Sequence, residues 1–279
     1  MSEAEHPIDH IVVAARDLEA LAARYEALGF TLTPRAAHPD HMGTANRLVQ
    51  FAGRNFIELL EVDRPERLRE HDLAASPPHF SFGAFNRDFL EAGEGCSMLV
   101  LAGQDSAADA ARFAQAGLTG YAPFDFGRRA TLPDGSEVEV AFSLAFATDP
   151  EVPRAAFFTC HNRFPEDFWK PAFQVHANGA ERIAAAYMVA QAPERHAGFL
   201  QGFTGAGAVP VPGGLRFACG PHELLVLRPQ AIAALSPTAA NTEGGPRLAG
   251  FAVEGPGIEP RVTPPEEAGG AFIEWRRAV

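Results

Sequence analysis

Three stretches of the chain repeat one pattern of apolar and polar residues. The first, HIVVAARDLEALAARYEALGF (residues 10–30), aligns without a gap with MLVLAGQDSAADAARFAQAGL (98–118), and AYMVAQAPERHAGFLQGFTG (186–205) follows the same plan more loosely. Each stretch opens with a short apolar run typical of a buried strand and continues with apolar residues at helical spacing. The pattern therefore predicts a strand followed by an amphipathic helix in three places.

The ends of the predicted helices carry residues typical of helix termini. Asp17 precedes the first helix, where its carboxylate can accept hydrogen bonds from the free N–H groups of the first turn. Gly29 follows the last turn, where the backbone often adopts a left-handed conformation. Asp105 and Gly117 occupy the same places in the second copy. Both copies therefore predict a helix of about three turns.

Short strands are expected after each helix. In the first copy they are TLTPRAAH, ANRLVQF and FIELLEV, and in the second copy the turn PDG separates RRATL from SEVEVAF. Each copy thus predicts the order βαβββ, and the whole chain an α+β fold of repeated modules. The predicted division is 7–64 for module 1, 65–95 for a connecting loop, 96–162 for module 2, 163–180 for a loop, 181–230 for a degenerate module 3, and 231–279 for a loop-rich tail with a closing strand.

Composition and charge narrow the classes of function. The formal net charge is -12 and no run is rich in Lys and Arg, which argues against nucleic acid as a partner. No apolar run approaches the roughly 18 residues of a membrane-spanning helix, and the first residues lack the pattern of a signal peptide. The three cysteines are far apart and form no Cys-x-x-Cys pair. These features predict a cytoplasmic protein without membrane contact.

The stretch DHIVVAARDLEA, followed by GTANRLVQF and NFIELLEV, resembles the vicinal oxygen chelate superfamily and, within it, the glyoxalase-like domain proteins. The resemblance implies the glyoxalase/bleomycin resistance/dihydroxybiphenyl dioxygenase fold, in which paired βαβββ modules surround a concave sheet. It also implies one divalent metal ion (zinc, iron, nickel or manganese), held by a residue of the first strand and a carboxylate of the fourth. Members include lyases, isomerases, dioxygenases and metal-free binding proteins, and the fold alone does not choose among them.

Two residues of module 1 match these ligand positions. Strand alternation places His10 on one face with Ile8 and Val12, where the resemblance puts the first-strand metal ligand. Glu58 in FIELLEV matches the fourth-strand carboxylate, and burial among apolar neighbours requires that it have a partner. Two other interpretations stay open. His10 can be a core histidine bonded to the backbone, and a one-residue slip would turn Glu61 inward in place of Glu58.

Module 2 departs from the implied ligand set. Met98 stands at the position equivalent to His10, and its thioether is a poor ligand for hard or borderline metals. His161 in FFTCHNR ends the predicted fourth strand and is the candidate third metal ligand, although it can equally be a loop residue. If modules 1 and 3 pair instead, the alternative ligand is Glu223 in PHELLVL, with Ala186 at the first-strand position.

Further candidates surround the expected metal site. The segment HPDHMGTANRL resembles a GTxN loop of the same family, in which Asn46 and Arg47 would orient a substrate oxygen or carboxylate. His41 is a candidate base or extra ligand. A plainer interpretation is that this segment only shapes a turn. Phe164, Phe168 and Trp169 in RFPEDFWKP either line a substrate pocket or anchor a long loop.

The resemblance predicts a metal-dependent enzyme that binds a small oxygen-rich substrate by bidentate chelation, either a glyoxalase-like lyase or isomerase or a ring-cleaving dioxygenase, with Glu58 and His41 as catalytic residues. The alternative is a metal-free small-molecule-binding module of the bleomycin-resistance kind, favoured by Met98 and Ala186 at ligand positions and by the 22 Phe residues. An odd number of copies leaves one module without a partner. That module would need either a second chain, as in a homodimer, or a covering loop.

Overall fold

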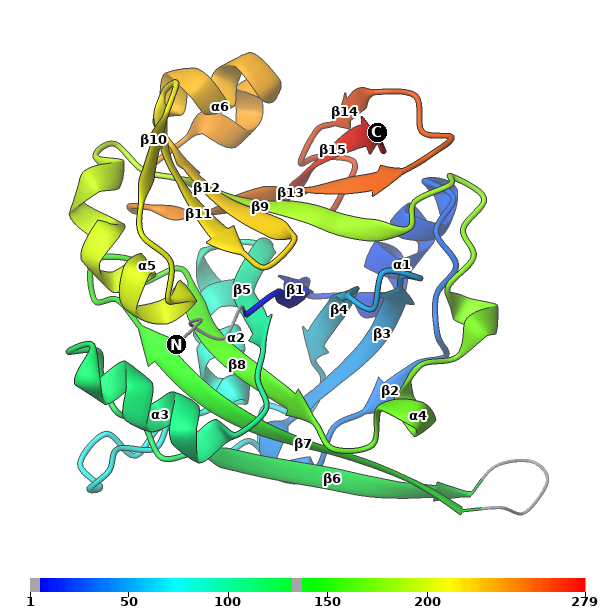
Figure 1. The fold of residues 1–279 in the computed structure, drawn as a ribbon. Coiled ribbons are helices and arrows are strands. Elements are labelled where there is room, and N and C mark those ends of the chain that lie inside the picture. The colour runs from blue at the N-terminus through cyan, green and yellow to red at the C-terminus, as the bar shows by residue number, and fades with distance from the viewer. Residues whose placement is uncertain (1–5, 132–136, 279) are drawn as a thin grey trace.

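Two curved β-sheets form the centre of the molecule (Figure 1). The computed structural model describes residues 6–131 and 137–278. Within these residues the strands form one eight-stranded and one seven-stranded sheet, with helices packed between and around them. The predicted class, an α+β fold of repeated modules, is confirmed.

The first sheet joins modules 1 and 2 side by side, in the strand order β2-β3-β4-β1-β5-β8-β7-β6. The first strand of each module runs parallel to the fourth, and the modules meet at the antiparallel pair β1–β5. The strands are β1 (Ile8–Ala14), β2 (Ala36–Ala37), β3 (Thr44–Gln50), β4 (Phe56–Val62), β5 (Gly95–Ala102), β6 (Phe124–Thr131), β7 (Glu137–Thr148) and β8 (Ala156–Asn162).

The second sheet repeats this plan in the order β10-β11-β12-β9-β13-β15-β14. Residues 231–279, expected to be a loop-rich tail with one closing strand, supply three of its strands. The Gly- and Pro-rich stretches that suggested a loop lie mainly between these strands. The strands are β9 (Arg182–Val189), β10 (Val209–Val211), β11 (Gly214–Cys219), β12 (His222–Leu227), β13 (Arg247–Gly255), β14 (Arg261–Thr263) and β15 (Phe272–Arg277).

The helices begin where the sequence predicts them in the first two modules. The Asp17 carboxylate accepts a hydrogen bond from Ala20 N, Asp105 caps its helix in the same way, and Gly29 and Gly117 have φ angles of 87° and 79°. No helix in the described parts of the chain is long and apolar enough to cross a membrane. The helices are α1 (Leu18–Ala27), α2 (Phe82–Ala92), α3 (Ser106–Gln115), α4 (Pro165–Phe168), α5 (Ala197–Thr204) and α6 (Pro229–Leu235), with short 3-10 helices η1 (Asp40–Met42), η2 (Pro171–Phe173), η3 (Pro193–His196) and η4 (Pro237–Ala240).

The core is divided by the sheets. The largest cluster of buried apolar residues lies between the two sheets and includes side chains of α1, α3 and α5. A second cluster covers the opposite face of the first sheet, where Phe82 and Phe89 of α2 pack on it. The segment 65–95, expected to be a connecting loop, therefore contains a helix that covers part of the concave face and leaves the remainder accessible.

Candidate functional site

A cavity of about 550 Å³ lies on the concave face of the first sheet. Strands β1, β3, β4, β6, β7 and β8 and helix α2 contribute to it, as do residues 33–39, Met42, Asp167, Phe168 and Lys170. A largely apolar cavity with a few polar groups suits a small organic molecule, because the walls bind its body and the polar groups fix its orientation. The aromatic walls are Phe56, Phe82, Phe126, Phe142, Phe158 and Phe168.

His10 reaches this cavity next to an irregularity in β1. The register of β1 against β5 shifts between Ile8 and His10, so Asp9 is an extra residue in the ladder. Ile8 consequently belongs to the core cluster between the sheets, and the prediction that it shares a face with His10 is wrong. Asp9 Oδ1 lies 2.5 Å from His10 Nδ1, and the imidazole stacks on Phe56 with 4.2 Å between ring centroids.

Glu58 faces the His10 imidazole across the floor of the cavity. Because a carboxylate accepts hydrogen bonds, the contact with Asp9 assigns the ring hydrogen of His10 to Nδ1 and leaves Nε2 with a lone pair. Nε2 lies 3.7 Å from Glu58 Oε2, which is too far for a direct hydrogen bond. The other oxygen, Oε1, accepts a hydrogen bond of 2.6 Å from Asn46 Nδ2. Glu61 accepts instead from the backbone N–H at the start of α1.

His38 is a site residue that the sequence pattern did not reveal. Its Nε2 lies 3.2 Å from Asn46 Nδ2 and 3.6 Å from Glu58 Oε1, and its Nδ1 lies 2.8 Å from Thr44 Oγ1. His38 directly follows the two-residue strand β2, which pairs with β3 so that Ala36 is opposite Asn46. This pairing places His38 next to Asn46. A two-residue strand leaves no periodic signal in the sequence, and the nearby His41 was predicted in its place.

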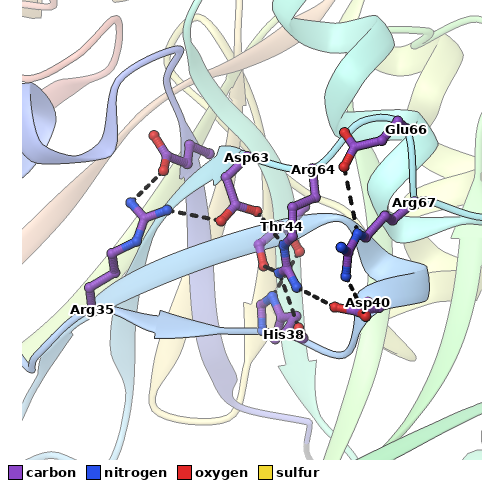
Figure 2. Close-up of polar contacts among 9 residues, drawn as sticks. Arg35, His38, Asp40, Thr44, Asp63, Arg64, Glu66 and Arg67 are labelled. Atoms are coloured by element: carbon purple, nitrogen blue, oxygen red, sulfur yellow. Dashed lines mark hydrogen bonds and ion pairs between the residues drawn. The ribbon is translucent and has the colours of Figure 1, made fainter.

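A charged network holds the segment that carries His38 (Figure 2). The Arg64 guanidinium donates to the backbone carbonyls of His38 and Thr44, at 3.1 and 2.8 Å, and to Asp40 Oδ1 at 2.8 Å. Arg67 makes a further contact of 2.8 Å with Asp40. The wall of the cavity from His38 to Thr44 is thereby attached to the chain that follows β4.

Module 2 contributes mainly apolar groups and one thiol. Met98 is fully buried in the cluster on the cavity face, and Phe158 and Cys160 of β8 line the cavity. Burial, together with the nearby carboxylates of Asp9 and Glu58, raises the pKa of Cys160 well above its ordinary value. Cys160 is therefore a neutral thiol at pH 7 and neither a ready nucleophile nor a ready metal ligand.

The structure does not bring His161 to the cavity. Successive side chains of a strand point to opposite faces of the sheet. Because Phe158 and Cys160 of β8 line the cavity, His161 belongs to the other face, and it is absent from the lining of the cavity. The prediction of a third metal ligand required the end of this strand to turn His161 inward. The register of β8 instead turns Cys160 toward the cavity and His161 toward the opposite face of the sheet.

Arg47 also lies on the far face of the sheet from the cavity. Its neighbour Asn46 lines the cavity, whereas Arg47 donates to the backbone carbonyl of Thr33 and forms ion pairs with Glu19 and Glu26 of α1, at 3.2 and 2.9 Å. Of the two adjacent residues predicted to orient a substrate, the structure places only Asn46 at the cavity. Arg47 attaches α1 to β3.

Three other predicted residues, His41, Phe164 and Trp169, do not line the cavity. The ring of His41 packs against Phe124 with 5.7 Å between centroids, and burial lowers the pKa of His41. In the segment RFPEDFWKP, Phe168 lines the cavity, whereas Phe164 and Trp169 do not. Trp169 contacts Phe168 with 5.0 Å between centroids. Of these three aromatic residues, which were predicted either to line a pocket or to anchor a loop, only Phe168 reaches the cavity.

Glu223, the alternative metal ligand, belongs to the second sheet. It lies on β12 and accepts a hydrogen bond of 3.2 Å from Arg276 Nη1 on β15. Since β12 and β4 are in different sheets, Glu223 does not share a site with His10 and Glu58. Module 1 pairs with module 2, so the arrangement that would have used Glu223 is not adopted.

The side chains at the cavity do not fit the full metal centre that the resemblance implies. Within residues 6–131 and 137–278, no group of three or more His, Cys, Asp or Glu side chains is placed to hold a metal ion. His10 Nε2 and Glu58 Oε2 face each other, but His38 Nε2 faces the Asn46 amide, whose NH₂ group has no lone pair for a metal. Catalytic zinc sites commonly use three protein ligands.

Comparisons with known proteins agree with the fold. A family model described as a glyoxalase-like domain matches residues 8–204. A hypothetical protein from Staphylococcus aureus shares 13% identity with a TM-score of 0.72, over 98% of this chain and 100% of that chain. A mutant of 4-hydroxymandelate synthase from Streptomyces coelicolor shares 11% identity with a TM-score of 0.53, over 90% of this chain and 71% of that chain. No curated protein matches the sequence. The family match confirms the resemblance to the glyoxalase-like domain proteins, and the two solved structures agree with the fold.

Proposed function

This chain belongs to the glyoxalase-like domain family, and from the cavity on its first sheet we propose that it is an enzyme that moves a proton on a small-molecule substrate. The observation that carries the proposal is the pair of Glu58 and His10, a buried carboxylate and a buried imidazole side by side at the cavity. Each is held by a further polar side chain, Asn46 for Glu58 and Asp9 for His10.

Glu58 is the proposed general base. Asn46 occupies Oε1 and orients the carboxylate, so that Oε2 is the atom left to accept a proton from a substrate C–H or O–H group. The electron pair of the broken bond stays on the substrate.

His10 is the proposed partner in the proton transfer. With the hydrogen on Nδ1 directed to Asp9, Nε2 is directed to the cavity and can take up or return a proton at a second substrate atom. Asp9 is a positioning residue, since it contacts His10 and does not line the cavity. The apolar walls reduce the competition of water for these groups, which strengthens electrostatic interactions in the cavity.

Deuterium uptake tests this proposal across several substrate classes at once. The protein is incubated in D₂O with a mixture of 2-keto acids, 2-hydroxy acids and acyl thioesters, and mass spectrometry records which compounds gain deuterium at carbon. We expect wild-type protein to label at least one compound and Glu58→Gln to label it at least about 100-fold more slowly. Glu223→Gln, the matched change in the second sheet, should label like wild type. Equal labelling by Glu58→Gln, or no labelling by wild type, would contradict the proposal.

A metal-dependent reaction is the second candidate, because the lone pairs of His10 Nε2 and Glu58 Oε2 face each other. A zinc, iron, nickel or manganese ion held by these two residues would act as a Lewis acid toward two oxygens of a substrate, the chemistry expected of a lyase, isomerase or dioxygenase. Elemental analysis of wild type, His10→Ala and Glu58→Ala decides between the candidates. Near-stoichiometric metal in the wild type that is lost in both variants supports the metal, and a wild type that binds none after reconstitution opposes it.

A metal-free binding module is the non-enzymatic alternative, and ligand binding without turnover would favour it. We also propose a cytoplasmic location. The homodimer was expected because one module would lack a partner; since the tail pairs with module 3 in the second sheet, that reason no longer applies, and the homodimer stays a prediction. Cys96, Cys160 and Cys219 are buried and unpaired, so the described fold does not depend on a disulfide bond among them. Sedimentation analysis of the purified protein tests the dimer.

A further inference from the structure

The distribution of basic residues in the chain is unusual. The sequence contains 22 arginines and a single lysine, Lys170, in a chain with a formal net charge of -12. This lysine lines the cavity on the first sheet. Lysine presents a compact charge on a flexible stem, which suits contact with a ligand whose anionic group can take several positions.

Among the described residues, Lys170 and Arg35 are the two basic side chains of Lys or Arg that line the cavity, and they differ in their ion pairs. Arg35 also lines the cavity, but its guanidinium is paired with Glu61 and, at 2.9 Å, with Asp63. Within the described residues, Lys170 forms no ion pair within 4 Å. The residue is half-buried and lines the cavity.

The backbone that carries Lys170 is held in place. Lys170 N donates to Gln50 Oε1 at 3.1 Å, and Gln50 Nε2 donates to the carbonyl of Phe168 at 2.9 Å. Gln50 ends β3, on the same face of the strand as Leu48, which is paired with Glu58 on β4. The base of the lysine side chain is therefore fixed relative to the proposed catalytic carboxylate, while the ammonium group remains adjustable.

We propose that Lys170 binds an anionic group, a carboxylate or a phosphate, of a substrate whose body is aromatic or otherwise apolar. Phe168, two residues before Lys170, contacts both Phe56 and Phe142, and these three rings of the cavity would bind that body. The carboxylate of Glu58 lines the same cavity and repels an anion, which favours binding of the anionic group at Lys170. The naming of this substrate class rests on the proposed function, but the anion site itself does not require that Glu58 be a base.

Asp167 allows a second test of the proposal, because it lines the same cavity and has the opposite charge to Lys170. An anion bound to Lys170 would be repelled by this carboxylate. Asp167→Asn is therefore expected to tighten the binding of an anion, whereas Lys170→Gln is expected to weaken it. A site that binds only by apolar contact would respond to neither change.

The single lysine makes a direct experiment practical. Reductive methylation with ¹³C-formaldehyde keeps the positive charge and labels Lys170 and the N-terminal amine, and Lys170→Gln identifies the Lys170 signal by removing it. The labelled protein is titrated with phenylacetate, 3-phenylpropanoate, 4-phenylbutanoate and phenyl phosphate, each beside its neutral amide or, for the phosphate, phenol. The carboxylate and phosphate members distinguish the two sources of the anion.

The expected result is that at least one anion shifts the Lys170 signal, but not the N-terminal signal, and binds about tenfold more tightly than its neutral counterpart. In unlabelled protein followed by calorimetry, Lys170→Gln should abolish that preference, Lys170→Arg should keep most of it and Asp167→Asn should increase it. If no anion in the set binds more tightly than its neutral counterpart, or if Lys170→Gln keeps the preference, the proposal is wrong. Glu58→Gln removes a repelling charge and is expected to retain or tighten anion binding while it slows deuterium labelling, so failure of the anion site and failure of the proposed proton transfer are distinguishable.

Discussion

At the scale of single residues, one carboxylate decides which nitrogen of His10 carries hydrogen. Asp9 accepts from Nδ1 at 2.5 Å, and this contact directs the Nε2 lone pair to Glu58. His176 provides a comparison, because its Nδ1 accepts from Thr31 N and its Nε2 donates to the carbonyl of Gln50. Two histidines of the same molecule are thus held in opposite tautomers by their hydrogen-bond partners.

Asp9→Asn is expected to change the tautomer of His10. The new amide can donate to Nδ1, so the form with hydrogen on Nε2 becomes populated. Long-range ¹H–¹⁵N NMR at alkaline pH reports the tautomer of each ring directly. We expect the wild type to carry hydrogen on Nδ1 of His10 and the variant to show a mixture or the reverse, while His176 stays unchanged. An identical His10 tautomer in both proteins would show that Asp9 does not position the ring.

Part of the site was predictable from the sequence at this scale. His10 and Glu58 stood out because ionisable residues interrupt strongly apolar strands in positions that the family resemblance marks. The extra residue at Asp9 was not predictable, because a bulge depends on the register with β5, far along the chain. His38 was missed because its place depends on contacts with Thr44, Asn46 and Glu58, none of which a local pattern encodes.

At the scale of elements, Arg64 joins the segment carrying His38 to the chain after β4. Removing its guanidinium leaves the carbonyls of His38 and Thr44 without these donors. Arg64→Met is therefore expected to lower the free energy of unfolding by about 1–2 kcal/mol and to speed amide exchange over residues 38–44. Denaturant unfolding and hydrogen exchange measure the two effects.

Arg67→Met is the matched control, because Arg67 makes side-chain ion pairs on the surface and its side chain is 55% exposed. Such pairs contribute about 0–1 kcal/mol. Arg64 would not hold this wall of the cavity if Arg67→Met lowered the stability as much as Arg64→Met does. The same conclusion would follow if Arg64→Met left amide exchange over residues 38–44 unchanged.

At the scale of the whole molecule, His222 links the two sheets. It begins β12 in the second sheet, and its Nδ1 accepts a hydrogen bond of 3.0 Å from Ile8 N of β1 in the first. Burial, with the nearby positive charge of Arg182, lowers the pKa of His222 from 6.5 to about 4. The folded protein therefore binds a proton at His222 more weakly than the unfolded chain does.

Stability is expected to fall as the pH decreases from about 6.5 to about 4. Above this window His222 is neutral in both states, so its full contribution is present. Between pH 6.5 and pH 4 the unfolded chain binds the proton at His222 and the folded protein does not. The free energy of unfolding therefore falls by roughly 3 kcal/mol across this window. Thermal or urea unfolding across the window measures the slope.

His222→Asn keeps an acceptor for Ile8 N but does not titrate, so its stability should fall less steeply over the same window even if the variant is less stable at pH 7. His79→Asn, at an exposed histidine, should retain the slope of the wild type. Parallel slopes in His222→Asn and wild type would mean that the link between the sheets is not the source of the pH dependence.

The sequence by itself determined the repeated βαβββ order, the helix caps at Asp17 and Asp105 and the apolar strands that carry His10 and Glu58, because these features arise from near neighbours along the chain. Only the tertiary structure decided that module 1 pairs with module 2, that the tail completes a second sheet, and that His161 and Arg47 face away from the cavity. The physical reason is that pairing and register depend on contacts between distant segments. A shift of one residue in a strand moves a side chain to the other face.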